Sequence, residues 1–388
     1  MSAQIIGWAH TRFGKSEAPD TTALMAEVIG PALHHAGIGA EDVDGIFCGV
    51  WNNGFQAQDF QAALVGMAYP ALAQVPAVRL ENACATGSAA LFAALDFIAA
   101  GRGRIALVLG SEKMTAIPGT RAGDILLAAS WMREEAGPAG FAGVFSRITQ
   151  EYFHRNGDHS SEMAMIAAKN HHNAMANPLA HLHKDLGIDF CDAVSDLNPL
   201  VAASLRRSDC APLSDGAAAL VIADAGTAAT MQRAIAFRAR VQTNDVLALS
   251  QRDPIAFDGP RRAWAGALKT AGLTAVTDLD LVETHDCFTI AEMIQYEAMG
   301  LTPPGQGWSA ISEGRVLMGA ELPVNPSGGL KARGHPIGAT GISMQVMAAQ
   351  QLMGEAGGMQ VPGAALAGVM NMGGAAVASY VSVLERVK

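Results

Sequence analysis

The chain has 388 residues, of which 50% are hydrophobic and 16% charged, with a formal net charge of −10. Its length exceeds the size at which one hydrophobic core usually stops growing, so two domains or a duplicated core are expected. The acidic balance and the lack of long Lys/Arg runs exclude a typical nucleic-acid-binding protein. The high apolar fraction excludes a disordered chain and favours large buried layers, including a shared subunit surface.

The five cysteines are odd in number and contain no CxxC pair, a pattern typical of free thiols in a reducing compartment. The first residues carry charge and lack the apolar run of a signal peptide, and no apolar stretch is long enough to span a membrane. The final tripeptide is not a peroxisomal signal. We therefore expect a cytoplasmic protein that needs neither a membrane nor nucleic acid as a partner.

Three segments of the first half recur, in the same order, in the second half. The pairs are 36–44 with 271–280, 84–89 with 338–343, and 214–222 with 373–381. In chain order, the first copy predicts a strand at 45–50, a helix at 88–99 and a strand at 104–109. The last of these is apolar throughout, which is typical of a sheet covered on both faces. Three recurring segments in the same order indicate two copies of one βαβ-rich unit.

The distances between the recurring segments within each copy locate an insertion in the first copy. From Ala85 to Gly216 is 131 residues, whereas the matching distance from Ala339 to Gly374 is 35. The first copy therefore carries 96 more residues, roughly at 115–209, which we expect to form a lid with a helix around 161–177. The predicted halves are 1–230, with the lid inside it, and 231–388.

Cys84 is the strongest candidate for a catalytic side chain. It lies in Glu81-Asn-Ala-Cys-Ala-Thr-Gly-Ser, between a predicted strand at 75–80 and an Ala-rich helix. Free N–H groups and the macrodipole of a helix start stabilise a thiolate and lower its pKa from about 8.5. The structural alternative is a small thiol buried in a strand–helix corner.

Three further segments carry groups suited to catalysis. The glycine-rich stretch 325–341 contains His335 before Pro336, and glycines let the backbone approach a ligand closely. His285, Asp286 and Cys287 follow a predicted strand, where α/β proteins place ligand sites, although Asp286 could simply cap the next helix. Asn371-Met-Gly373-Gly374 offers backbone N–H groups to an oxyanion.

Together these segments resemble the thiolase family. ENACATGSAA, HDCFT, NPSGGLKARGHPIGATG and NMGGAAVASYV are similar to its four active-site loops, and HDCF resembles the sterol-carrier-type branch. The resemblance covers essentially the whole chain. It implies an α/β fold with a five-layered αβαβα core of two similar halves and an inserted loop domain. It also implies acyl-CoA and CoA as substrates, with no metal and no separate cofactor.

The resemblance assigns roles by motif. Cys84 would accept the acyl group, His335 would take its proton, and the N–H groups of Cys84 and Gly373 would hold the thioester oxygen. His335 and His285 would polarise the second substrate. Ser327 and Gly328, in the glycine-rich stretch, are expected to contact CoA.

Two departures from the best-known thiolase pattern affect the second half-reaction. An Asn-Glu-Ala-Phe loop is replaced by His285-Asp-Cys-Phe, and the second catalytic cysteine is replaced by Asn371. In the sterol-carrier-type branch a cysteine of the HDCF loop is thought to act as acid and base. The resemblance therefore assigns that role to Cys287.

The predicted activity is that of an acyl-CoA C-acyltransferase, which forms or cleaves the carbon–carbon bond of a 3-ketoacyl-CoA. The alternatives are a retro-aldolase acting on a β-hydroxyacyl-CoA, a decarboxylating ketosynthase, and a non-catalytic acyl-CoA- or lipid-binding protein. A retro-aldolase needs no acyl-accepting thiol, so the presence of Cys84 argues against that alternative. A protein that only binds acyl-CoA or lipid needs neither Cys84 nor His335, so the presence of both argues against simple binding. A homodimer or homotetramer is expected, and the need for a small partner protein is left open.

Overall fold

The computed structural model describes residues 3–388. Its strands are β1 (Ala3–His10), β2 (Gly45–Gly49), β3 (Ala77–Leu80), β4 (Ile105–Glu112), β5 (Leu200–Ala202), β6 (Leu205–Arg206), β7 (Gly216–Asp224), β8 (Ile235–Asn244), β9 (Leu281–Thr284), β10 (Leu366–Gly373) and β11 (Ala378–Arg386). Its α-helices are α1 (Thr21–Ala36), α2 (Gln61–Ala68), α3 (Thr86–Ala99), α4 (Gly119–Leu127), α5 (Met132–Glu135), α6 (Gly140–Asn156), α7 (Ser160–Ala174), α8 (Gly187–Asp192), α9 (Ala225–Ala228), α10 (Asp258–Ala271), α11 (Thr289–Ala298), α12 (Gly307–Ser312) and α13 (Ile337–Met353). None of these described helices is long and apolar enough to cross a membrane.

Strand pairing shows the internal duplication directly. In the first half β1 pairs antiparallel with β7 and β7 with β4, and β4 pairs parallel with β2 and β2 with β3. In the second half β8 pairs antiparallel with β11 and β11 with β10, and β10 pairs parallel with β9. A parallel bridge between Val282 and Val324 takes the place that β3 has in the first half. The prediction of two similar halves is confirmed.

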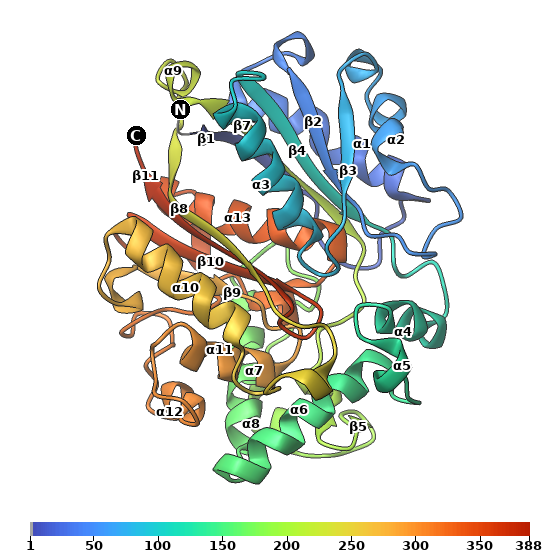
Figure 1. Cartoon of the computed structure of the whole chain (residues 1–388), viewed down its shortest axis with the longest axis vertical. Coiled ribbons are helices and arrows are strands. Elements are labelled where there is room, and N and C mark those ends of the chain that lie inside the picture. The colour runs from blue at the N-terminus through green and yellow to red at the C-terminus, as the bar shows by residue number, and fades with distance from the viewer. Residues whose placement is uncertain (1–2) are drawn as a thin grey trace.

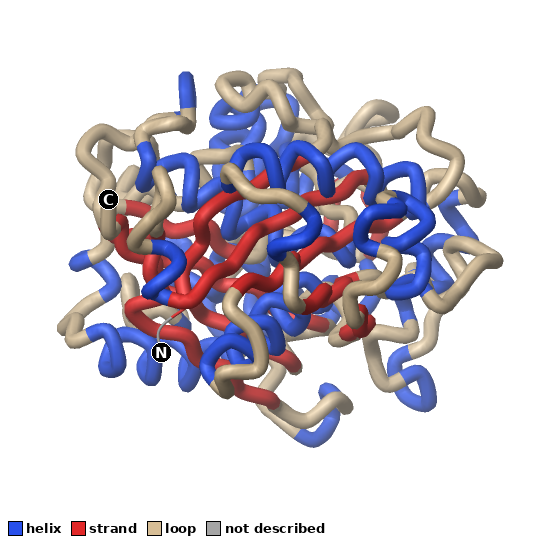
Figure 2. The backbone as a smooth tube through the Cα atoms, turned by 90° about the horizontal axis from the view of Figure 1, so that it is seen from above, coloured by secondary structure: helices blue, strands red, loops and turns tan. Residues whose placement is uncertain are grey.

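The two halves meet along a short seam between β1 and β8. Only Gln4 with Ala236 and Ile5 with Ile235 are in register across it. This pairing joins the strands into the order β3-β2-β4-β7-β1-β8-β11-β10-β9. Within this continuous sheet the strands of each half form a separate layer, referred to below as the sheet of that half, with helices packed on both of its faces (Figures 1 and 2). Residues of β4 and β7 are buried throughout, as the uninterrupted apolar runs predicted.

The helices complete five layers. α1 covers the outer face of β1, β4 and β7, and α10 covers β8 and β11 on the opposite side of the molecule. α3 and α13 lie between the sheets, because α13 packs against β4 and β7 of the first half and also against β10 of the second (Figure 1). The αβαβα core predicted from the resemblance is therefore confirmed.

The first turns of α3 and α13 touch backbone to backbone. A Cβ atom on Gly87 would lie 2.9 Å from the Gly338 carbonyl oxygen and from the Ile342 nitrogen. Likewise a Cβ on Gly341 would collide with the Ser88 nitrogen. The repeated Ala-Thr-Gly therefore has a steric cause, since each copy of its glycine makes room for the other copy's helix.

The inserted segment lies between β4 and β7 and contains α4 to α8 with the small β5–β6 hairpin. Its central helix α7 corresponds to the helix expected around 161–177. α7 packs against α8, α11, α12 and the π-helical turn Gly329–Arg333, so it lies on the second half of the core. Figure 1 shows the segment at the lower end of the molecule, below both sheets.

The glycine contact gives a stability prediction. Gly87→Ala should lower the free energy of unfolding by about 1–3 kcal/mol, because the added methyl group overpacks a rigid backbone contact. The matched control is Gly123→Ala in α4, where no atom lies within 4 Å of the new methyl group. That variant should be neutral or up to about 1 kcal/mol more stable, since Ala has the higher helix propensity. Equal denaturation midpoints for the two variants would contradict the close contact.

Candidate active site

Cys84 lies in a tight turn between β3 and α3. The turn is closed by hydrogen bonds from the Ala85 and Thr86 N–H groups to the Asn82 and Ala83 carbonyl oxygens, at 3.0 Å each. Ala83 has a φ of 48°, a left-handed conformation that costs a non-glycine residue free energy. The thiol is 4% exposed. The turn therefore holds Cys84 two residues before the start of α3, as the sequence predicted.

The Gly373-Gly374 turn closes over Cys84 from the other half of the molecule. A Cβ on Gly373 would collide with the Asn82 carbonyl oxygen, and Gly374 has a φ of 62°. The Gly374 backbone N–H is near enough to the Cys84 sulfur to oppose the rise in its pKa. Gly373 thus packs against the Cys84 turn, whereas its role as an oxyanion donor stays a prediction, and Gly374 brings a second backbone N–H close to the sulfur.

His335 follows the π-helical turn and precedes α13. Its Nδ1 lies 2.7 Å from the Thr340 hydroxyl oxygen, and that hydroxyl donates to the Pro336 carbonyl oxygen at 2.8 Å. The single hydroxyl proton is therefore used, so the hydroxyl accepts from His335 and Nδ1 carries the imidazole proton. Nε2 is left with a free lone pair, and it has no hydrogen-bond partner among the described residues. This is the form a general base needs.

His285 is fully buried just after β9. Its Nδ1 lies 2.9 Å from the Asn371 amide nitrogen, and its Nε2 has no partner among the described residues. The imidazole rings of His285 and His335 are 5.1 Å apart, centroid to centroid, and nearly perpendicular. Cys84 Sγ and one ring nitrogen of each histidine all lie within 4.8 Å of one another. The structure therefore brings together three of the predicted catalytic residues.

The electrostatic environment keeps all three groups uncharged. Burial, with Arg333 nearby, lowers the pKa of His335 to about 3. Burial lowers the pKa of His285 as well, with His335 and Arg333 as further causes. Burial also raises the pKa of Cys84 to about 12, although backbone N–H groups oppose the shift. The expectation that the helix start lowers the pKa of Cys84 is wrong here, because desolvation outweighs the helix end.

Cys287 is buried close to Cys84 but outside the three-residue cluster. It is 5% exposed, and burial raises its pKa well above the usual value, with Cys84 and Asp286 as further causes. Its carbonyl oxygen accepts from the Ala211 N–H at 2.9 Å, which ties the loop to the inserted segment. The role of Cys287 as an acid and base stays a prediction.

A buried polar network holds the loops that carry His285 and His335. Two residues of α7, Lys169 and Asn170, belong to this network and were not predicted from the sequence. The Lys169 ammonium donates to Glu292 at 2.5 Å and to the Val324 carbonyl oxygen at 2.8 Å. The Asn170 amide donates to both Asp286 and Glu292 at 2.7 Å. Asp286 also accepts from the Leu330 and Lys331 N–H groups. The carboxylate of Asp286 therefore holds the His335 loop.

Ser327 and Gly328 lie in that same buried turn and do not face Cys84. The Ser327 hydroxyl donates to Glu283 at 2.7 Å and accepts from the Arg333 guanidinium at 2.6 Å. Gly328 has a φ of 95°, and a Cβ there would lie 2.7 Å from Ala174 Cβ. In this structure their contacts are with the chain itself, so a contact with CoA stays a prediction.

A cavity of about 140 Å³ opens beside the Cys84 turn. Its lining combines that turn, the Gly373-Gly374 turn, the inserted segment and the loop after β8: Glu81, Asn82, Ala83, Ala128, Ala129, Leu247, Gly373, Gly374, Val377 and Ala378. The cavity therefore borders the Cys84 turn and the Gly373-Gly374 turn, although Cys84 itself does not line it.

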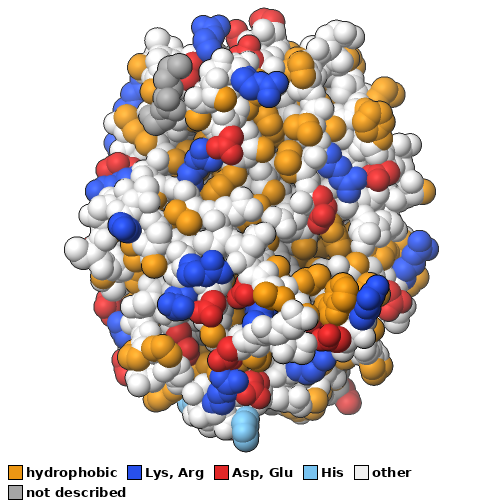
Figure 3. Space-filling model, viewed as in Figure 1, with side chains coloured by type: hydrophobic (Ala, Val, Ile, Leu, Met, Phe, Trp, Pro, Cys, Tyr) orange, Lys and Arg blue, Asp and Glu red, His pale blue; other side chains and the backbone are white. Residues whose placement is uncertain are grey.

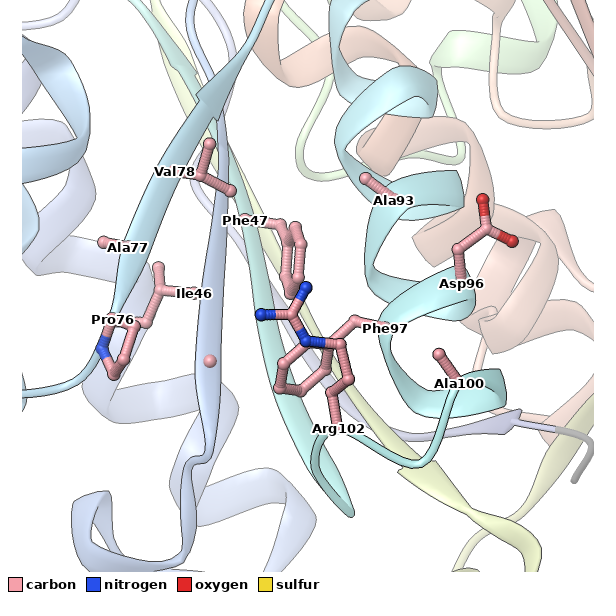
Figure 4. A pocket seen from close by; sticks show the side chains of 11 residues that line it. Ile46, Phe47, Pro76, Ala77, Val78, Ala93, Asp96, Phe97, Ala100 and Arg102 are labelled. Atoms are coloured by element: carbon pink, nitrogen blue, oxygen red, sulfur yellow. The ribbon is translucent and has the colours of Figure 1, made fainter.

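A larger cavity of about 620 Å³ lies elsewhere, between β2, the edge strand β3 and α3 (Figure 4). Phe47, Val78 and Phe97 make it apolar, and Asp96 and Arg102 stand at its rim. It contains no cluster of catalytic groups, so we do not assign the reaction to it. On the face in Figure 3, Lys and Arg side chains alternate with Asp and Glu and do not form a basic patch.

Comparison with known proteins agrees with this geometry. A thiolase N-terminal domain model matches residues 3–187, and a model for the thiolase C-terminal domain matches residues 241–386. The chain belongs to the thiolase family.

Relatives within the family differ in the activity their names state. The chain is 33% identical to the acetyl-CoA acetyltransferase of Methanothermobacter thermautotrophicus over 386 residues, covering 98% of this chain and 99% of that protein. It is 32% identical to human sterol carrier protein 2 over 317 residues, covering 77% of this chain and 56% of that longer protein. A solved structure of the Ltp2-ChsH2(DUF35) aldolase has a TM-score of 0.83 at 18% identity, covering 99% of this chain and 98% of that one. At that identity the last likeness shows a shared fold.

The pKa shifts give a prediction for this thiolase. The rate of Cys84 acylation should be level between about pH 5.5 and 8.5, because neither group of the pair titrates there. His335 would lose its function as base only as the pH falls towards about 3, and the Cys84 thiol would ionise alone only towards about 12. Single-turnover acylation at a series of pH values checks this. A step centred near the ordinary histidine value of about 6.5 would contradict it.

Proposed function

We propose that this protein is a thiolase of the acetyl-CoA C-acetyltransferase type, which transfers an acyl group through Cys84. The observation that carries the proposal is the buried cluster of a thiol, an imidazole lone pair and a second imidazole within 4.8 Å. A protein that only binds acyl-CoA needs none of these groups. The acetyl-CoA acetyltransferases among its relatives support the same conclusion.

In the first half-reaction Cys84 transfers its proton to His335 Nε2 as the sulfur attacks the thioester carbonyl. The developing oxyanion would be held by backbone N–H groups of Cys84 and Gly373, with the Gly374 N–H beside them. CoA leaves as a thiol after taking the proton from His335, and Cys84 keeps the acyl group. The high pKa of Cys84 means that proton transfer and attack belong to one coupled event, because a free thiolate would be costly.

In the second half-reaction Cys287 would first pass its thiol proton to His335 Nε2, which is free again after CoA has left. The resulting Cys287 thiolate would then remove a proton from the α-carbon of a second acetyl-CoA. His285, with His335, would polarise that substrate's carbonyl oxygen and stabilise the enolate. The carbanion then attacks the acyl group on Cys84, forming the carbon–carbon bond and breaking the bond to the Cys84 sulfur, which takes its proton back from His335, while Cys287 keeps the proton from the α-carbon.

Cleavage assays test the proposal against the retro-aldol alternative. The enzyme should cleave acetoacetyl-CoA only when CoA is added, yielding two acetyl-CoA, and should not cleave a β-hydroxyacyl-CoA to an aldehyde or ketone. Cys84→Ala should lose thiolysis by at least about 10²–10⁴-fold. Cys191→Ala, which removes a buried thiol from the inserted segment, should retain it. Aldol cleavage that survives Cys84→Ala would establish the alternative.

A second variant separates the roles of the two cysteines. Cys287→Ala should still exchange labelled CoA with acetyl-CoA, because that exchange needs only Cys84, His335 and the oxyanion donors. Condensation should fall by about 10²–10⁴-fold, since the α-proton has lost its base. If condensation proceeds at the wild-type rate, the role assigned to Cys287 is wrong.

The assembly state belongs to the proposal as well. The unpaired edge of β3 and the apolar cavity beside it form a surface where a second copy of the chain could add, in keeping with the expected homodimer or homotetramer. The name of the structurally similar aldolase joins Ltp2 to a DUF35 protein. We propose that a comparable small partner is dispensable for the chemistry, so the purified chain alone should perform thiolysis.

A further inference from the structure

We propose that Asn371 is a positioning residue that fixes the proton of His285 on Nε2, so that in the resting enzyme His285 Nε2 can only donate a hydrogen bond while His335 Nε2 can only accept one. The consequence for catalysis rests on the proposed function, whereas the proton position can be tested without any activity. In the sequence, Asn371 stood out only as the replacement of a second catalytic cysteine. The contacts of its side chain give it a role of its own.

The orientation of the Asn371 amide is settled by its neighbours. Its nitrogen lies 3.1 Å from the Cys84 carbonyl oxygen, which can only accept a hydrogen bond. Its oxygen lies 2.7 Å from the Ser88 hydroxyl, which can donate. A flipped amide would place two carbonyl oxygens against each other. The amide nitrogen therefore faces Cys84 and His285, and both of its protons are committed.

The proton position on His285 follows from that orientation. Because the Asn371 nitrogen is a donor only, His285 Nδ1 must be the acceptor of the 2.9 Å hydrogen bond. A neutral imidazole that accepts at Nδ1 carries its proton on Nε2. That Nε2 is buried and has no partner among the described residues, so it is a free donor at the site.

The two histidines thus hold opposite tautomers, each set by a neighbour of its Nδ1. Thr340 accepts from His335 and leaves Nε2 with a lone pair, whereas Asn371 donates to His285 and leaves Nε2 with a hydrogen. One imidazole is prepared to remove a proton and the other to stabilise an oxyanion. Two chemically identical rings within one cluster therefore perform two different tasks.

The charged groups around His285 keep this division in place. Burial disfavours protonation of His285 most, and the nearby His335 and the charge of Arg333 in the π-helical turn add to this, while the thiols of Cys84 and Cys287 are held uncharged by burial. His285 is accordingly neutral, and its tautomer is decided by Asn371.

The direct test is the protonation of the ring nitrogens in the resting enzyme. Nitrogen NMR of histidine-labelled protein, with the His285 signals assigned by their loss in His285→Gln, should show the proton on Nε2. In Asn371→Asp the proton should move to Nδ1, because a carboxylate can only accept. A wild-type His285 protonated on Nδ1 overturns the proposal, whether or not the enzyme is an acetyltransferase.

A pH profile of Asn371→Asp provides the functional readout. Its neutral His285 would lack an Nε2 hydrogen, so condensation should fall on the order of 10²-fold or more at high pH. Protonation of the ring restores that hydrogen, so the rate should recover as the pH falls through the pKa that the new carboxylate raises. CoA exchange at Cys84 should fall much less than condensation.

The control is Asn244→Asp at the exposed end of β8, which makes the same substitution away from the site and should keep the wild-type profile. A loss in Asn371→Asp that is independent of pH, and equal for exchange and condensation, would show that Asn371 only supports the Cys84 turn. That result would overturn the proposal.

Discussion

The contact between the first turns of α3 and α13 is the constraint on which the site depends. Cys84 lies two residues before the start of α3, and His335 lies two residues before the start of α13. Because Gly87 and Gly341 let the two helices meet backbone to backbone, the residues before them are brought into the same small volume. The nucleophile comes from the first copy of the duplicated unit and the base from the second. The active site is therefore a product of the interface between the halves, and neither half contains it alone.

Burial of that interface sets the chemistry of the groups within it. Removal from water holds the Cys84 thiol and both imidazoles in their neutral forms, so a thiolate–imidazolium pair is not the resting state. Hydrogen bonds to Nδ1 of each histidine then decide where the protons reside. Below the loops, Asp286 and Glu292 receive hydrogen bonds from Lys169, Asn170 and backbone N–H groups, which compensates for their removal from water. Burial and the neighbouring Glu292 raise the pKa of Asp286 to about 7. Hydrogen-bonded polar groups position the loops, and the reacting groups stay uncharged.

Much of the fold could be predicted from the sequence, because it is recorded in local patterns. The apolar runs at 45–50 and 104–109 match β2 and β4, the expected helix at 88–99 lies within α3, and three recurring segments in the same order revealed the duplication. Cys84, His335 and His285 could be selected because glycine-rich turns and strand ends mark ligand sites.

The sign of the Cys84 pKa shift could not be predicted, since desolvation depends on the full depth of packing. The contribution of Lys169 and Asn170 was also hidden, because their partners are more than a hundred residues away. The same holds for the proton positions, which depend on Thr340 accepting a hydrogen bond from His335 and Asn371 donating one to His285.

The central claim is that the acyl group is carried by Cys84. It is tested most directly by incubating the enzyme with acetyl-CoA alone, quenching in acid, and locating the acetyl group by peptide mass spectrometry. The account predicts one acetyl group per chain on the peptide containing Cys84, absent in Cys84→Ala, and still present in Cys287→Ala. An acetyl group found on Cys287, or no covalent acyl-enzyme at all in an enzyme that performs thiolysis, would contradict it.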